Sequence, residues 1–133
     1  MSTNALATFR ANLVHALDQA GIPTTDHLPS VIGTTPAAIL QHGAPYLELT
    51  DAQTYAEAEV RARLDVRLLA DPTTDNADAT HALDHLLVQA ATALTRAGFD
   101  PLDFQEPEIF VSQGINYLSI RITVSAWLTI DRT

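Results

Sequence analysis

The sequence predicts an α+β fold in which two helices pack on one face of a mainly antiparallel sheet of about four strands, in the order α-β-β-α-β-β. Two long stretches, Tyr55–Ala70 and Ile115–Ile130, alternate between apolar and mostly polar residues over nearly their whole length, and a period of two is typical of strands with one buried face. Two other stretches repeat leucine and alanine every three or four residues, as amphipathic helices do. With 133 residues, of which 47% are apolar, residues 1–133 are predicted to form a single domain with a substantial core.

The first helix is expected over about Asn4–Ala20. Its apolar residues recur at spacings of three and four and therefore share one face: Leu6, Phe9, Leu13 and Leu17. Gly21 stands where a helix commonly ends with a residue of positive φ, and Pro23 prevents the helix from continuing.

The stretch Gly21–Ala37 contains three prolines and shows no period. Unpatterned loops of this length tend to be functional or disordered. A short strand is expected next, over Ala38–Gln41 and continuing into Tyr46–Thr50, with a bulge or turn at Gly43–Pro45.

The first long strand, Tyr55–Ala70, has apolar residues at every even position and mostly charged residues at the odd ones. This alternation predicts one buried and one solvated face. About fifteen residues at ~3.3 Å each extend roughly 50 Å, whereas a compact chain of this length has a diameter of roughly 36 Å. The long strands must therefore twist, bend or project, and projecting strand edges tend to pair with a partner.

The second helix is expected to follow a turn at Asp71–Asp75, with Asp75 as its cap, and to end near Ala97 before Gly98. Its predicted buried stripe consists of Ala82, Leu83, Leu86, Leu87, Ala90 and Leu94. A short strand is then expected over Glu108–Ser112, joined by a turn at Gln113-Gly114 to the last long strand.

Composition excludes several classes of function. The chain has no cysteine, so it has no disulfide, no thiolate zinc site and no cysteine nucleophile. A net charge of −9 and a pI near 4.6 argue against a protein whose main task is to bind nucleic acid. The first residues lack the pattern of a secretory signal, and no stretch approaches the ~20 apolar residues of a membrane helix. We therefore expect an intracellular protein without a membrane segment.

Catalytic motifs are absent from the sequence. His81 and His85 have the i, i+4 spacing of a metal-binding pair, but the residues between them do not form the His-Glu-x-x-His motif and no third histidine lies at a suitable spacing. The pair is predicted to belong to a solvated helix face. There is no Gly-x-Ser-x-Gly elbow and no glycine-rich phosphate loop. We predict no catalytic residue, no metal and no cofactor, and hence a protein that is not an enzyme.

An arginine ladder is the clearest candidate for an interaction surface. Arg61, Arg63 and Arg67 share one face of the first long strand, and Arg121 joins them if the two long strands are neighbours. The ladder either binds an anion or the carboxylates of a neighbouring subunit, or forms cross-strand pairs with Glu57, Glu59 or Glu48.

Trp127 stands on the polar register of the last strand, opposite the apolar face. It either lies on Tyr117 or an arginine stem, or anchors a contact with another chain, where tryptophan is often a hot spot. The predicted subunit interface therefore consists of Arg61, Arg63, Arg67, Arg121 and Trp127.

The order of elements resembles the tail terminator proteins of long-tailed bacteriophages, and the resemblance covers nearly the whole chain. It is carried by a leucine-rich helix, a proline-rich loop, the phrase VRARLDVRLL at 60–69, a helix that closes with ALTRAGFDP at 93–101, and a long final strand. The resemblance implies a non-enzymatic subunit of a ring, typically of six subunits in that family, which caps the tail tube and meets the head connector.

The implied partners are other copies of the chain, the tail tube protein and the head–tail connector protein. DNA is expected to pass through the ring without specific binding, which the negative charge would favour. The implied location is the host cytoplasm during assembly and then the tail or neck of the virion. The loop Gly21–Ala37 is expected to pack poorly in an isolated subunit and to order on assembly.

Three other functions remain open at this point. The first is another neck or tail component, such as a head–tail joining protein or a tube subunit. The second is a small metal-dependent enzyme that uses His81 and His85. The third is a stand-alone binding module that uses the long loop Gly21–Ala37.

Overall fold

The computed structural model describes residues 5–27, 32, 35–53, 57–70, 76–99 and 102–131. The two helices in these residues are α1 (Ala5–Gln19) and α2 (Asn76–Arg96). The six strands are β1 (Thr24–Thr25), β2 (Ala37–Gln53), β3 (Glu57–Leu69), β4 (Leu102–Phe104), β5 (Glu108–Ser112) and β6 (Ile115–Asp131). The predicted α+β class is confirmed, and both long strands and both helices lie where the sequence patterns indicate.

The six strands form one sheet in the order β1-β2-β3-β6-β4, with β5 also paired to β6. Every pairing is antiparallel except that of β1 with β2. The prediction of about four strands is therefore wrong in number, because β1 and β4 are two and three residues long and too short to show a period.

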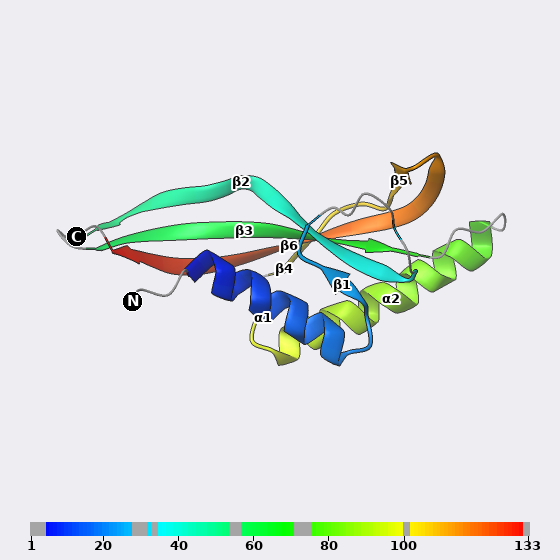
Figure 1. Cartoon of the computed structure of the whole chain (residues 1–133), viewed down its shortest axis with the longest axis horizontal. Coiled ribbons are helices and arrows are strands. Elements are labelled where there is room, and N and C mark those ends of the chain that lie inside the picture. Colours follow the sequence, from blue (N-terminus) through cyan, green and yellow to red (C-terminus); the bar gives the residue numbers. More distant parts are fainter. Residues whose placement is uncertain are drawn as a thin grey trace.

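Both helices cover the same face of the sheet (Figure 1), as predicted. The core between the two layers joins the even-numbered side chains of β3 and β6 to the apolar stripes of the helices. Leu13, Leu17, Leu64 and Leu94 are completely buried there. The predicted buried stripe of α2 is wrong at one position, since Ala82 is exposed and Ala79 is buried instead. The reason is that the helix packs on the sheet through the face that carries Leu83, Leu86 and Ala90.

The opposite face of the sheet is not uniformly solvated, contrary to the prediction. Ile39, Leu69 and Tyr117 are buried there in a second, smaller core, against which Ile32 and Phe110 pack. The reason is the β5–β6 hairpin, which curls away from the helices (Figure 1) and brings Phe110 of β5 onto this face. A period of two identifies the two faces of a strand, but it does not report what later folds over the polar one.

The helix ends and the hairpin turn follow the predictions. Gly21 and Gly98 have φ of 84° and 92°, and each follows a helix whose last turn is closed by a backbone hydrogen bond to a carbonyl five residues earlier, from Ile22 to Leu17 and from Phe99 to Leu94. Gln113 and Gly114 both have positive φ, as a two-residue hairpin turn requires. The predicted turn at Asp71–Asp75 and its capping residue lie outside the described residues.

A bulge interrupts β2, as predicted at Gly43–Pro45. The register passes from His42, opposite Leu64, to Leu47, opposite Ala62, so residues 43–46 of β2 face a single residue of β3. A Cβ at Gly43 would lie only 2.6 Å from Cβ of Arg63 and 2.8 Å from its carbonyl oxygen. The close approach of the two strands therefore requires glycine here.

The three long strands, β2, β3 and β6, extend together beyond the helices at the end near the C-terminus (Figure 1). The pairing of β3 with β6 continues to Glu57 opposite Asp131. We call the helix-free part the projecting end and define it as residues 47–53 of β2, 57–61 of β3 and 127–131 of β6. Of the three outcomes expected for strands of this length, namely twisting, bending or projecting, projection is seen at this end.

The loop Gly21–Ala37 is better packed than expected in its described part. Ile22 is buried in the main core, and Thr24 and Thr25 pair with β2. Parallel pairing over so short a segment leaves no sequence period, which is why the packing of this segment was not predicted.

Candidate functional site

The arginine ladder lies on the sheet face opposite the helices. The pairing of β3 with β6 places Arg61 opposite Trp127 and Arg67 opposite Arg121, so the two long strands are neighbours and Arg121 joins the ladder as predicted. The five predicted interface residues therefore lie on one face, but their partners differ along it.

Arg67 and Arg121 are neutralised within the chain. Nη1 of Arg67 donates to Oε1 of Glu108 at 2.8 Å, and its Nε donates to Oε1 of Gln41 at 2.8 Å. Arg121 is paired with Glu108 at 3.2 Å and with Asp65 at 3.5 Å. The pKa of Glu108 lies below its ordinary value, chiefly because Arg67 donates a hydrogen bond to it and also because both cations attract its charge.

Phe110 completes the surroundings of Arg67, since the guanidinium lies 4.7 Å from the centre of its ring. With only 9% of its surface exposed, Arg67 cannot reach a partner from the surface. It fixes the β5 hairpin to the sheet by binding Glu108.

Arg63 has a cross-strand partner. Its Nη1 lies 2.9 Å from Oε2 of Glu48 and 3.4 Å from the carbonyl oxygen of Pro45. This is the pair with Glu48 that the sequence allowed as one alternative.

Arg61 and Trp127 differ from the rest of the ladder. The guanidinium carbon of Arg61 lies 5.8 Å from the centre of the Trp127 ring, and Nη2 is 3.5 Å from the hydroxyl of Ser125. Nε of Arg61 is buried and has no hydrogen-bond partner within the described part of the chain. Trp127 remains 63% exposed despite this contact. The guanidinium of Arg61 therefore lies over the ring of Trp127, and most of the tryptophan side chain still faces solvent.

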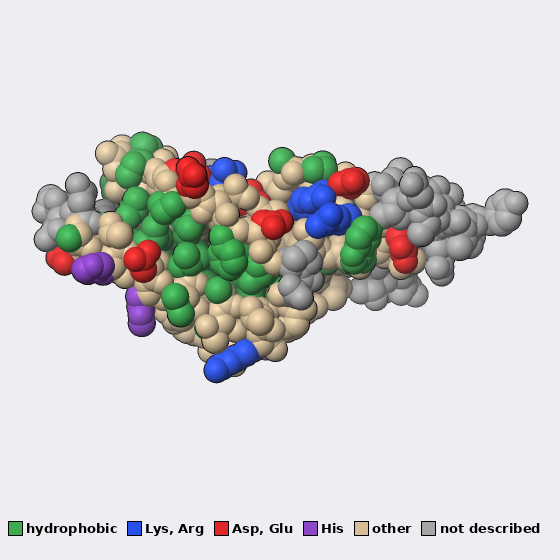
Figure 2. Space-filling view, turned by 180° about the vertical axis from the view of Figure 1, so that it is seen from behind, with side chains coloured by type: hydrophobic (Ala, Val, Ile, Leu, Met, Phe, Trp, Pro, Cys, Tyr) green, Lys and Arg blue, Asp and Glu red, His purple; other side chains and the backbone are tan. Residues whose placement is uncertain are grey.

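Other large apolar side chains are exposed on α2, β4 and β5: Val88, Phe104, Ile109 and Val111. Hydrophobic side chains gather on one part of the face shown in Figure 2, and cationic and acidic side chains adjoin one another on other parts of it. The sequence analysis did not identify these residues, because an apolar residue in a strand is usually buried.

His81 and His85 are both exposed on α2. Among the residues that the structure describes, no group of three or more histidine, aspartate or glutamate side chains is placed to hold a metal ion. Neither described helix is long and apolar enough to cross a membrane.

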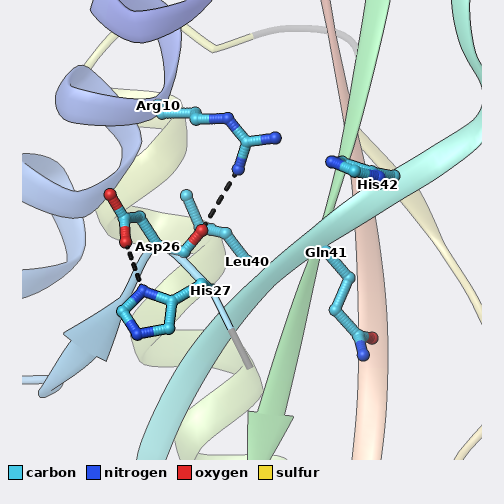
Figure 3. Close-up of a pocket in the computed structure, with 6 residues that line it drawn as sticks. All are labelled: Arg10, Asp26, His27, Leu40, Gln41 and His42. Atoms are coloured by element: carbon cyan, nitrogen blue, oxygen red, sulfur yellow. Dashed lines mark hydrogen bonds and ion pairs between the residues drawn. The ribbon is translucent and has the colours of Figure 1, made fainter. Parts of the chain in front are cut away.

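A pocket that the sequence analysis missed lies between α1 and β2. It is lined by Arg10, Asp26, His27, Leu40, Gln41 and His42 (Figure 3). Nη1 of Arg10 donates to the carbonyl oxygen of Asp26 at 3.1 Å, and Nη2 donates to the hydroxyl of Tyr46 at 3.0 Å. The residues come from a helix, a loop and the strand β2, so no spacing in the sequence could bring them together.

Comparison of the chain with models of known protein families gives no match, and comparison with curated proteins gives none either. The function must therefore be inferred from the surfaces described above.

Proposed function

We propose that the protein is a structural ring subunit that caps the tail tube of a long-tailed bacteriophage and joins it to the head connector. The proposal combines the resemblance of the sequence with one observation: among the described strands, none pairs with the two outer edges of the projecting end, which also carries an exposed tryptophan. Assembly into a ring would bury these features.

The outer edges of β2 and β6 are open for most of the projecting end. The pairing of β1 with β2 stops at Ile39, and the pairing of β4 with β6 reaches only to Val124. Among the described strands, none pairs with the outer side of either strand further toward the projecting end. Unpaired edges of this length readily accept a strand from another chain.

The directions of the strands specify the contact that a ring would use. Because β3 is antiparallel to both β2 and β6, these two edge strands run in the same direction. If β6 of one copy paired with β2 of the next, the new pairing would be parallel. The same contact repeated head to tail generates a closed ring when the rotation between copies closes.

Electrostatics also fits a ring through which DNA passes. Arg63, Arg67 and Arg121 have carboxylate partners within the chain, so the ladder does not present their charge to phosphates. The net charge of −9 would repel DNA and would reduce binding to the wall of a channel.

The test is the mass of the purified protein in solution, alone and with the tail tube protein of the same phage. We expect a ring-sized oligomer in at least one of these conditions. Trp127→Ala should lower the melting temperature by no more than a few degrees and should weaken assembly at least tenfold, as expected for a hot spot worth ~2 kcal/mol or more. The matched control is Val88→Ala, which truncates another exposed apolar side chain on α2 and should assemble normally.

A protein that stays monomeric in both conditions would refute the proposal. Binding to a head-completion protein, but not to the tube protein, would instead identify another neck component. A Trp127→Ala variant that assembles like wild type would show that Trp127 is not part of the interface.

A further inference from the structure

We propose that the pocket between α1 and β2 binds an oxyanion, a carboxylate or a phosphate, with Arg10 as its principal ligand. This inference is independent of the proposed function, because it depends on a different surface of the molecule. The two groups that accept hydrogen bonds from Arg10 are neutral, whereas Arg67 binds the carboxylate of Glu108.

Arg10 is held in place without being neutralised. Its two described hydrogen bonds go to a backbone carbonyl and to the hydroxyl of Tyr46, which occupy two of the five N–H donors of a guanidinium. No ion pair of Arg10 with a carboxylate is present among the described residues. A half-buried guanidinium that is fixed but not neutralised can donate charge-assisted hydrogen bonds to an anion.

The bulge in β2 builds the wall opposite Arg10. It brings His42 and Tyr46 together as a stacked pair with ring centres 4.3 Å apart, and the guanidinium carbon of Arg10 lies 5.8 Å from the Tyr46 ring. Figure 3 shows the guanidinium of Arg10 pointing across the pocket toward His42. The cation therefore has a defined position on the side where a ligand would enter.

Asp26 is the acidic group nearest to this site, and its carboxylate is turned away from the guanidinium. Oδ1 of Asp26 lies 2.7 Å from Nδ1 of His27, and Figure 3 shows this pair on the far side of the Asp26 backbone from Arg10. The hydrogen bond with His27 is the main reason why the pKa of Asp26 lies below its ordinary value, and the positive charge of Arg10 makes the smallest of the contributions that lower it. Arg10 thus meets the carbonyl oxygen of Asp26 and not its carboxylate, so its charge remains available to a ligand.

The experiment is a titration of the whole protein with inorganic phosphate at constant ionic strength, followed by NMR of the Arg10 guanidinium and the His42 and His27 rings. We expect saturable shifts of these groups. Arg10→Gln should weaken binding about tenfold or more, as loss of a charge-assisted hydrogen bond predicts. The matched control is Arg96→Gln, which removes the same charge from an exposed position at the end of α2 and should bind like wild type.

A parallel titration with acetate separates the two sources of the oxyanion. Phosphate that binds at least tenfold more tightly than acetate identifies a phosphate site, and similar affinities identify a carboxylate site. The proposal is overturned if neither anion gives saturable shifts, if Arg10→Gln binds like wild type, or if Arg96→Gln loses binding equally. The wild-type shift at the Arg10 guanidinium is informative even if Arg10→Gln does not fold.

Discussion

The same strand, β3, passes through two different environments. In its central part Leu64 and Val66 are buried under the helices, and on the opposite face Asp65 and Arg67 are at most 9% exposed. At the projecting end the polar face carries Arg61 beside an exposed Trp127. The alternating pattern is the same in both parts, so the difference lies in what covers the strand.

The covered part and the projecting end also differ in how their charged side chains are paired. In the covered part Arg67 and Arg121 share the carboxylate of Glu108, whereas Arg61 at the projecting end has no carboxylate partner among the described residues, only a ring and a distant hydroxyl. The Nε atoms of Arg61 and Arg121 are alike in being buried without a hydrogen bond there, so the two parts differ in how charge is paired. A subunit that folds alone must neutralise the charges of its covered part by itself. Its projecting end can leave a charge for a partner to pair with, and the following predictions test this division.

The largest expected effect is a difference in the free energy of unfolding between two leucine-to-alanine variants of the sheet. Leu64→Ala should lower the free energy of unfolding by about 2–5 kcal/mol, because Leu64 is completely buried between the helices and the sheet. Leu47→Ala should cost less than about 1 kcal/mol, because Leu47 is 40% exposed at the projecting end. Chemical denaturation of the two variants measures both values. Equal losses would mean that the projecting end is packed as tightly as the covered part.

The next largest effect on stability is expected at the bulge in β2, which lies between the covered part and the projecting end. Gly43→Ala should destabilise the protein by about 1–3 kcal/mol, because the new Cβ would meet the backbone of Arg63 at less than 3 Å. The control is Gly114→Ala, where no atom lies within 4 Å of the new Cβ but φ is 74°, so its cost is conformational only.

Crystallographic or NMR comparison of the two variants would locate the change. Gly43→Ala should shift the register of β2 around His42 and Leu47 and disturb the pocket at Arg10. A Gly43→Ala variant with wild-type stability and register would show that the strands can separate there at no cost.

Local patterns predicted much of the fold from the sequence. The two periods located both helices and the long strands β3 and β6, and the glycines at 21 and 98 located the helix ends, since each of these signals lies within a few residues of chain. The strand β2 was expected to be short and interrupted, whereas it spans Ala37–Gln53. The burial of Tyr117 and Leu69 was not predictable in this way, because it depends on the β5 hairpin folding across another strand. The strands β1 and β4 were missed for a related reason, since neighbours distant in sequence define them.

The same distinction applies to the candidate sites. The ladder was predictable because its arginines recur within one strand, and the register then added Arg121. The partner of Arg67, Glu108, comes from another strand and was not predicted. The lining residues of the Arg10 pocket come from a helix, a loop and the strand β2, so the pocket could be recognised only in the tertiary structure.

The smallest expected effect concerns the charge that holds the β5 hairpin in the covered part. The pKa of Glu108 is lowered in the folded protein by the hydrogen bond from Arg67. A carboxyl whose folded pKa is lowered stabilises the protein above its unfolded pKa, near 4.3 for glutamate, and this contribution is lost as the pH falls through the folded pKa. Glu108→Gln should therefore be less stable than wild type near pH 7, and the difference should disappear as the pH falls through the lowered pKa of Glu108 in the folded protein.

The difference at pH 7 should be below about 1 kcal/mol, because the Glu108 side chain is 41% exposed and solvent screens its pairs. Urea denaturation at several pH values measures it, and Glu106→Gln, which removes an exposed carboxylate two residues away, is the control for net charge. If the cost of Glu108→Gln stayed constant at all of these pH values, the hairpin would depend on packing against Phe110 and not on charge. The covered part and the projecting end would then differ in apolar contacts alone, and the intrachain pairing of the ladder would contribute little to the separation between them.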